Sequence, residues 1–273
     1  MDEINNSPFY LENGRAMISL GPVSPNRHCS FKCPFCYVKS ESFVKYVNWG
    51  VEQTIEWLND NSNEIQIIYI SGDTDSFAPP RTNSALNLLE QVSFLQKDVL
   101  FTTRYLFEES HLNRLNIIGQ NLKRTGNLSI ACTSVCQLSH PHLEPKPIRD
   151  PQERIWQIGR FKEAGWIPVL AMRPIMPNIP GEEYSKIIEL ASDYTDLCLI
   201  SSYYYDPNSE QIQPNTEVKH VGKLFFDIGD FADWVKVDPQ PEVISSIMNT
   251  AEKCKMNIFE QSSILYSFLK QKQ

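Results

Sequence analysis

Short apolar runs alternate along the chain with segments in which apolar residues recur at helical spacing. The runs lack the alternation of a half-exposed strand, so they predict strands that are covered on both faces. The predicted strands are Ala16–Leu20, Ile65–Ile70, Val99–Thr103, Leu128–Thr133, Ile167–Met172 and Asp196–Ser201. The helical faces between them are Val51, Ile55 and Leu58; Leu86, Leu89 and Leu95; Ile155, Ile158 and Phe161; and Tyr184, Ile187, Ile188 and Ala191.

This alternation predicts an α/β fold with parallel strands, in the form of a partial, open (β/α)6 barrel of the TIM type. We expect one domain over residues 1–273, with the barrel at about 15–201 and a closing segment at about 202–273. The closing segment is predicted to contain a polar loop at Asp206–Glu217, strands at Lys223–Ile228 and Asn257–Glu260, and helices at Val243–Ala251 and Leu265–Leu269. In such barrels the binding and catalytic residues gather at the C-terminal ends of the strands.

Length and charge narrow the class of protein. The 273 residues suit one barrel-type domain, and no stretch reaches the roughly 18 consecutive apolar residues of a membrane span. The polar, acidic segment Met1–Ser7 does not resemble a signal peptide, so we expect a cytoplasmic protein without a membrane partner. The net charge of −8 argues against an extensive nucleic-acid-binding surface, which would need clustered Lys and Arg.

Three of the seven cysteines, Cys29, Cys33 and Cys36, lie within eight residues after the first predicted strand. In a reducing compartment such a cluster favours metal ligation over disulfides. Three thiolates can hold three irons of a cubane cluster and leave the fourth iron open to another ligand. Zinc is the alternative, although the spacing fits the paired ligands of a zinc site poorly. The candidates for a fourth zinc ligand are His28, Cys132 and Cys136.

The cysteine spacing, with Phe35 directly before the last cysteine, resembles the signature of the radical SAM superfamily. The resemblance implies that Cys29, Cys33 and Cys36 carry a [4Fe-4S] cluster. It also implies that S-adenosylmethionine (SAM) binds the open iron through its amine and carboxylate, and that Phe35 packs beside the adenine. The chemistry of these cofactors calls for an electron donor of the flavodoxin or ferredoxin type.

Ser71, Gly72 and Asp73 follow the second strand, where the superfamily carries a Gly-Gly-Glu-like segment that receives the SAM amino group. Gly72 would let backbone carbonyls approach the ammonium, and Asp73 or Asp75 would supply the negative charge. The alternative is a plain turn with side-chain hydrogen bonds from the aspartates.

Thr133 and Ser134, at the end of the fourth strand, resemble the polar pair that contacts the SAM carboxylate or ribose in related enzymes. Arg173, at the end of the fifth strand, is a fixed cation suited to that carboxylate. A capped strand end for the two hydroxyls and an ordinary ion pair for Arg173 are the alternatives.

A narrower resemblance joins the segment Leu143-Glu144-Pro145-Lys146-Pro147 to Arg154, Ala164-Gly165 and the run from Arg173 to Gly181. It is similar to the branch that contains spore photoproduct lyase and its DNA-repair-photolyase-like relatives, which also carries a Thr-Asp-Pro-Tyr-type segment where this chain has Thr74–Phe77. By analogy with a loop cysteine of that lyase, Cys136 is the candidate catalytic residue, predicted to face the barrel mouth and to donate a hydrogen atom. Cys132, Cys198 and Cys254 are predicted to be structural.

Three functions follow as hypotheses. The first is a radical SAM enzyme that reductively cleaves SAM to a 5′-deoxyadenosyl radical and abstracts hydrogen from a nucleic-acid base, nucleotide or small metabolite. The second is a single-cluster maturase that modifies a peptide or partner protein. The third is a non-enzymatic zinc or iron–sulfur binding module. The run Tyr203–Tyr205 either stacks on a base, orients a radical or packs on the core.

Overall fold

The structure is a computed structural model that describes residues 9–20, 29–36, 50–72, 74–205, 211, 219–222 and 234–273. An eight-stranded sheet lies at its centre, with the strand order β1-β2-β3-β4-β5-β6-β7-β11. The strands are β1 (Phe9–Glu12), β2 (Arg15–Ile18), β3 (Ile67–Ile70), β4 (Asp98–Thr103), β5 (Ser129–Ser134), β6 (Ile167–Met172), β7 (Leu197–Ile200) and β11 (Asn257–Phe259). All neighbours are parallel except β1 and β2, which confirms the predicted α/β fold.

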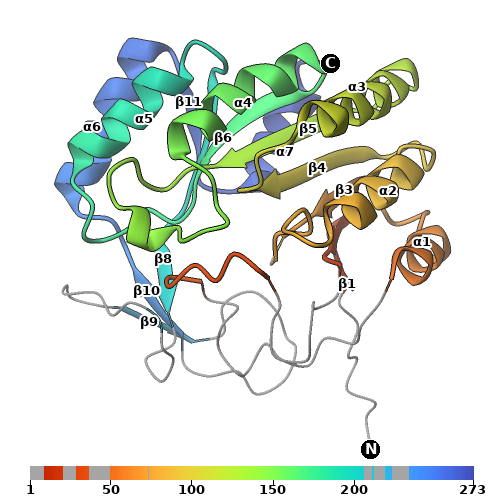
Figure 1. The fold of residues 1–273 in the computed structure, drawn as a ribbon, viewed down its shortest axis with the longest axis horizontal. Coiled ribbons are helices and arrows are strands. Elements are labelled where there is room, and N and C mark those ends of the chain that lie inside the picture. The colour runs from red at the N-terminus through yellow and green to blue at the C-terminus, as the bar shows by residue number, and fades with distance from the viewer. Residues whose placement is uncertain are drawn as a thin grey trace, which may run out of the picture.

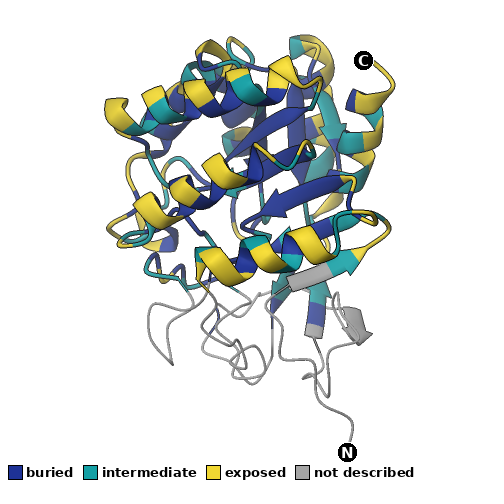
Figure 2. Ribbon diagram, turned by 90° about the vertical axis from the view of Figure 1, so that its right-hand side faces the viewer, coloured by how far each residue is buried: buried dark blue, intermediate teal, exposed yellow. Residues whose placement is uncertain are grey.

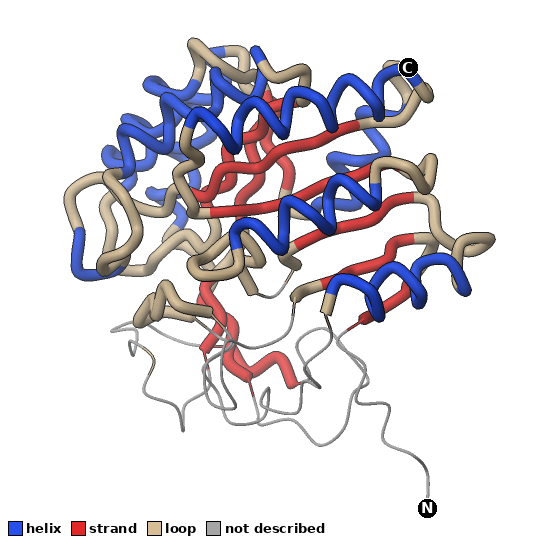
Figure 3. Tube along the Cα trace, turned by 45° about the vertical axis from the view of Figure 1, so that its right-hand side comes forward, coloured by secondary structure: helices blue, strands red, loops and turns tan. Residues whose placement is uncertain are grey.

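Helices cover the outer face of the curved sheet (Figure 3). Figure 2 shows the consequence: the strands are buried, and the helices expose the sides that face away from them. The predicted helical faces at Val51, Ile155 and Tyr184 all fall in helices, whereas Leu95 lies in the turn after its helix. The helices on this side are α1 (Val51–Asp60), α2 (Thr82–Val92), α3 (Glu109–Arg124), α4 (Pro151–Glu163), α5 (Gly181–Ala191) and α6 (Pro241–Cys254).

The inner face of the sheet is covered at its base by the helix α7 (Ser262–Lys270). Leu265 and Leu269 of α7 pack with Leu100, Leu128 and other inner-face residues of the strands. Two polar side chains of α7 also reach Asp98, the first residue of β4: the Tyr266 hydroxyl donates to its carboxylate at 2.7 Å, and Lys270 Nζ lies 3.0 Å from the same oxygen. The base of the barrel is therefore closed, and the opposite edge carries the C-terminal ends of the strands.

The closing segment adds a small antiparallel sheet that the sequence pattern did not predict. It consists of β8 (Tyr203–Tyr205), β9 (Lys219–Gly222) and β10 (Trp234–Val237), with β10 in the middle. Tyr203 and Tyr205 are buried and their rings stack at 5.9 Å, so the core-packing alternative holds for these two. The predicted strand at Asn257–Glu260 and the two predicted helices of this segment are confirmed. The predicted strand at Lys223–Ile228 and, apart from Gln211, the predicted loop at Asp206–Glu217 lie outside the described residues.

Strand β1 was also not predicted, although the sequence contains its signal. Asn13 and Gly14 join β1 to β2 with φ values of 51° and 76°, and Asn-Gly is the preferred pair for a tight hairpin with both central residues in the left-handed region. None of the helices in the described ranges is long and apolar enough to cross a membrane.

Candidate functional site

The cysteine loop follows β2 and lies at the C-terminal edge of the sheet. Figure 1 shows it as the red-orange segment beside β8. Two contacts fix the end of β2 before the loop: Arg81 Nη1 donates to the Leu20 carbonyl at 2.6 Å, and the Leu20 amide donates to Ser76 Oγ at 3.2 Å. Gln211 Nε2 donates to the Phe35 carbonyl at 3.1 Å and to the Tyr204 carbonyl at 3.2 Å, which ties the loop to β8.

The three predicted cluster ligands lie near one another in this loop. Cys33 is buried, Cys29 and Cys36 are half-buried, and the Cys36 amide donates to the Cys33 carbonyl at 3.1 Å. Burial raises the pKa of both Cys29 and Cys33 to about 12, and the charges of the neighbouring loop cysteines contribute to both shifts. Metal ligation would therefore displace protons from thiols that are neutral at pH 7.

The donor set suits a cubane cluster. In the described part of the chain, no three His, Cys, Asp or Glu side chains converge as a group that could hold a single metal ion. A cubane binds each thiolate at a separate iron, so its ligands need only share one neighbourhood. Cys29, Cys33 and Cys36 lie on one loop and are close enough for their charges to act on one another. Phe35, buried in the same loop, is the residue expected beside the adenine.

The segment after β3 differs in part from expectation. Ser71 has a left-handed φ of 67°, and its hydroxyl accepts a hydrogen bond from the Ser76 amide at 2.9 Å, so it organises the turn. Gly72 lies against Met17, since an added Cβ would stand 2.3 Å from Met17 Cε. Asp73 lies outside the described residues. The roles of Ser71, Gly72 and Asp73 toward the SAM amine thus stay predictions.

Asp75 has its carboxylate turned into the protein. It accepts hydrogen bonds from Thr103 Oγ1 at 2.9 Å, from the Arg104 amide at 2.7 Å and from the Phe77 amide at 3.0 Å. Burial raises the pKa of this carboxyl group. The contact with Phe77 is an Asx turn, so the turn alternative describes Asp75 better than a role as acceptor for the SAM ammonium.

Three predicted SAM contacts carry buried polar atoms that have no hydrogen-bond partner in the described part of the chain. These atoms are Thr133 Oγ1, Ser134 Oγ and Arg173 Nε. Arg173 Nη2 donates to the Glu260 carbonyl at 3.0 Å. Because buried polar groups are nearly always satisfied, Ser134 Oγ and Arg173 Nε are candidates for contact with a polar ligand at this edge. Thr133 shares with Ala131 the face of β5 that the helices cover, so its predicted contact with SAM stays a prediction.

Thr74 is a further candidate that sequence reasoning did not select. Its Oγ1 is also buried and unpartnered among the described residues. The sequence contained a signal for it, because Thr74 begins the segment that resembles the Thr-Asp-Pro-Tyr-type motif, four residues after the end of β3.

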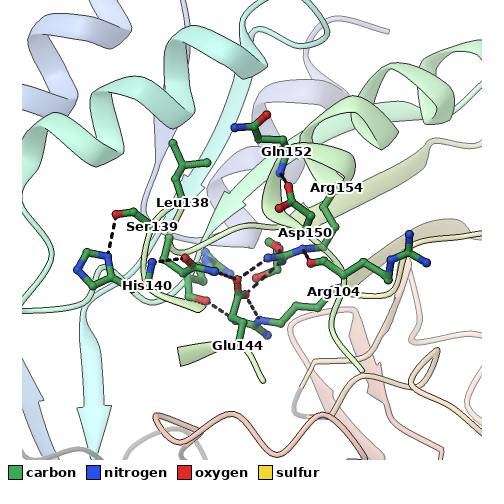
Figure 4. Close-up of polar contacts among 12 residues, drawn as sticks. Arg104, Leu138, Ser139, His140, Glu144, Asp150, Gln152 and Arg154 are labelled. Carbon is green, nitrogen blue, oxygen red and sulfur yellow. Dashed lines mark hydrogen bonds and ion pairs between the residues drawn. The ribbon is translucent and has the colours of Figure 1, made fainter. Parts of the chain in front are cut away.

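A buried ionic network connects the site to the outer helices (Figure 4). Glu144 lies at its centre and is paired with Arg154 of α4 and, at 3.2 Å, with Arg104 Nε at the end of β4. Gln137 Nε2 donates to the same carboxylate at 2.9 Å, and Arg154 also donates to the Ser134 carbonyl. Burial opposes ionisation of Glu144, but Arg154 and Arg104 outweigh it and lower the pKa. The two motif residues of the narrower resemblance, Glu144 and Arg154, are thus direct partners.

Cys136 is fully buried, in the same apolar cluster as Cys33 and Phe35 of the cysteine loop. Burial raises the pKa of its thiol well above the ordinary value, with the Glu144 charge adding to the shift. Its predicted role as hydrogen-atom donor stays a prediction. Cys132 and Cys198 are buried in the core, in agreement with a structural role.

Comparison with known proteins places the fold. No family model and no curated protein matches the sequence. Among solved structures, a cysteine-to-serine variant of spore photoproduct lyase is 10% identical with a TM-score of 0.64, over 90% of this chain and 82% of the lyase. A double variant of that lyase with bound AdoMet and dinucleoside spore photoproduct is 15% identical with a TM-score of 0.60, over 84% of this chain and 73% of the lyase.

SuiB of Streptococcus suis, solved with bound S-adenosylmethionine, is 15% identical with a TM-score of 0.55, over 75% of this chain. The match covers 44% of SuiB, so this chain corresponds to less than half of that protein. The order of its strands and helices, with the cysteine loop after β2, thus gives this chain the α/β partial-barrel fold of the radical SAM enzymes spore photoproduct lyase and SuiB.

Proposed function

We propose that this protein is a radical SAM enzyme that cleaves SAM reductively and abstracts a hydrogen atom from a substrate. The observation that carries the proposal is the position of Cys29, Cys33 and Cys36, which lie on one loop at the C-terminal edge of a barrel shared with SAM-bound structures. When bound, a reduced [4Fe-4S] cluster supplies one electron to the SAM sulfonium, and breakage of the bond to the ribose carbon yields the 5′-deoxyadenosyl radical.

The residues of the chain would bind and orient the cluster and SAM. The three cysteines would hold the cluster, and Phe35 would pack on the adenine. Ser134 and Arg173 would direct their unpartnered polar atoms to the SAM carboxylate or ribose, and Thr133 is assigned to the same contact by the resemblance alone. The buried strand ends around them would exclude water from the radical.

For the substrate we propose a nucleic-acid base, nucleotide or other small metabolite. The support is the likeness to spore photoproduct lyase over most of the chain, since that lyase has been solved with a dinucleoside bound. The electron donor we propose is of the flavodoxin or ferredoxin type, because one electron is consumed for each SAM cleavage.

The test is cluster content and SAM cleavage. Protein reconstituted without oxygen should bind about four irons and four sulfides per chain and form 5′-deoxyadenosine with dithionite. Cys29→Ala, Cys33→Ala or Cys36→Ala should abolish 5′-deoxyadenosine formation. Cys198→Ala, the matched control in the core, should keep it and cost on the order of 1 kcal/mol of stability. Stoichiometric zinc without sulfide, or equal losses in all four variants, would refute the proposal.

A further inference from the structure

We propose that the fixed positive charge of Arg104, held beside the cysteine loop, raises the reduction potential of the cluster that this loop is proposed to bind. The inference rests on the proposed function and extends it to the control of electron entry. Neither the cysteine motif nor the pattern of strands singled out Arg104.

Arg104 is held at the end of β4 by contacts on three sides. Its Nη2 donates to the Arg173 carbonyl at 2.7 Å, and its Nε donates to Glu144 Oε1 at 3.2 Å. Its guanidinium carbon lies 5.3 Å from the centre of the Phe35 ring, in the cysteine loop itself. The side chain is 19% exposed, so its position is defined by the protein rather than by solvent.

The charge of Arg104 lies beside the cysteine loop. The ring that its guanidinium covers belongs to Phe35, which stands between the predicted ligands Cys33 and Cys36 in the sequence. The carboxylate of Glu144, bonded to the same guanidinium, places a negative charge close to that loop as well. In a buried site such interactions are screened less than at the surface, so one fixed cation has a measurable effect.

The sign of the effect follows from charge alone. One electron passes from the flavodoxin- or ferredoxin-type donor to the cluster, and no proton is needed because a guanidinium stays charged throughout. The reduced cluster is more negative than the oxidised cluster, so a nearby cation stabilises the reduced form and raises the potential. A nearby anion, such as Glu144, lowers it.

The experiment is a redox titration of the reconstituted protein, followed by the electron paramagnetic resonance signal of the reduced cluster. Arg104→Gln should shift the potential to more negative values, and Glu144→Gln should shift it to more positive values. Arg104→Lys keeps the charge and should restore most of the parent's potential. Arg114→Gln, which removes a half-buried arginine of α3 that pairs with Glu90, is the matched control and should leave the potential unchanged. Iron and sulfide content is measured for every variant.

An Arg104→Gln variant with full cluster content and the parent's potential would overturn the inference. So would shifts of equal sign in the Arg104→Gln and Glu144→Gln variants, because packing damage does not reverse with charge. If Arg104→Gln fails to fold or to hold a cluster, the Glu144→Gln variant tests the inference instead. A reduction potential in that variant equal to or more negative than that of the parent would contradict the inference. A parent protein that binds no cluster overturns the proposed function itself, which separates the two failures.

Discussion

At the C-terminal edge of the sheet, individual side chains carry polar atoms that the described part of the protein leaves unsatisfied. A buried donor or acceptor without a partner costs about 1–3 kcal/mol. Thr74, Thr133, Ser134 and Arg173 all carry such atoms, and they come from three different strand ends. A polar ligand that satisfied them would recover this free energy, which supports the proposed binding of SAM at this edge.

Arg173→Met tests the assignment of this residue to the SAM carboxylate. Methionine keeps much of the length of the side chain and removes the charge and every donor, so SAM binding should weaken by about 1.5–3 kcal/mol, or roughly ten- to a hundredfold. Isothermal titration of the reconstituted protein with SAM measures the change, and iron content should be unaffected. Normal SAM affinity with lost turnover would instead assign Arg173 to the substrate pocket.

At the scale of elements, the strands that depend on the local pattern of apolar residues were predictable from the sequence. The six predicted strands are all found, and each end lies within two residues of its predicted position. Fully apolar runs are predictable because they must be buried on both faces, and in this fold that position is the central sheet. The strand β8 was not predicted because it is formed by pairing with β10, a segment far along the chain, in a sheet of order β8-β10-β9. The pairing of Glu144 with Arg104, 40 residues away, has no sequence signal for the same reason.

Asp150→Ala tests a helix start that is readable from the sequence. Asp150 Oδ1 accepts a hydrogen bond from the Gln152 amide at 2.8 Å, and Pro151 begins α4, as expected for a capped helix. Removal of the cap should lower the free energy of unfolding by about 1 kcal/mol. Urea unfolding measures this loss, and Asp150→Asn, which keeps an accepting oxygen, should restore most of it. Equal losses in both variants would contradict the capping role.

At the scale of the whole molecule, the network around Glu144 connects the ends of β4, β5 and β6 with α4. Arg104 reaches the Arg173 carbonyl after β6, and Arg154 reaches the Ser134 carbonyl at the end of β5. A buried ion pair of this kind adds little net stability by itself, but the loss of one partner leaves an uncompensated charge. We therefore expect it to fix the relative positions of the strand ends that carry the site.

Glu144→Gln should make stability less dependent on acid pH. The pKa of Glu144 is lowered in the folded protein from the ordinary 4.5, so its contribution is fully present above that pH and is lost as the pH falls through the folded value. The variant should be less stable at neutral pH, by up to about 3–5 kcal/mol, and its unfolding free energy should fall less steeply below pH 4.5 than that of the parent.

Urea titrations at a series of pH values measure how the unfolding free energy of the parent and of the Glu144→Gln variant depends on pH. Glu189→Gln, which removes an exposed carboxylate of α5 paired with Lys186, should follow the parent at every pH. Parallel acid limbs for the parent and the Glu144→Gln variant would show that Glu144 is not part of the acid response.

The helix at the base of the barrel has a consequence for biosynthesis. Because α7 follows every strand that it covers, the ribosome makes Leu265 and Leu269 after Ile67, Leu100 and Leu128. Until α7 emerges, the inner face of a nascent barrel presents uncovered apolar side chains, and such surfaces are prone to aggregation or capture by chaperones. Emergence of α7 from the ribosome is thus the step that relieves this exposure.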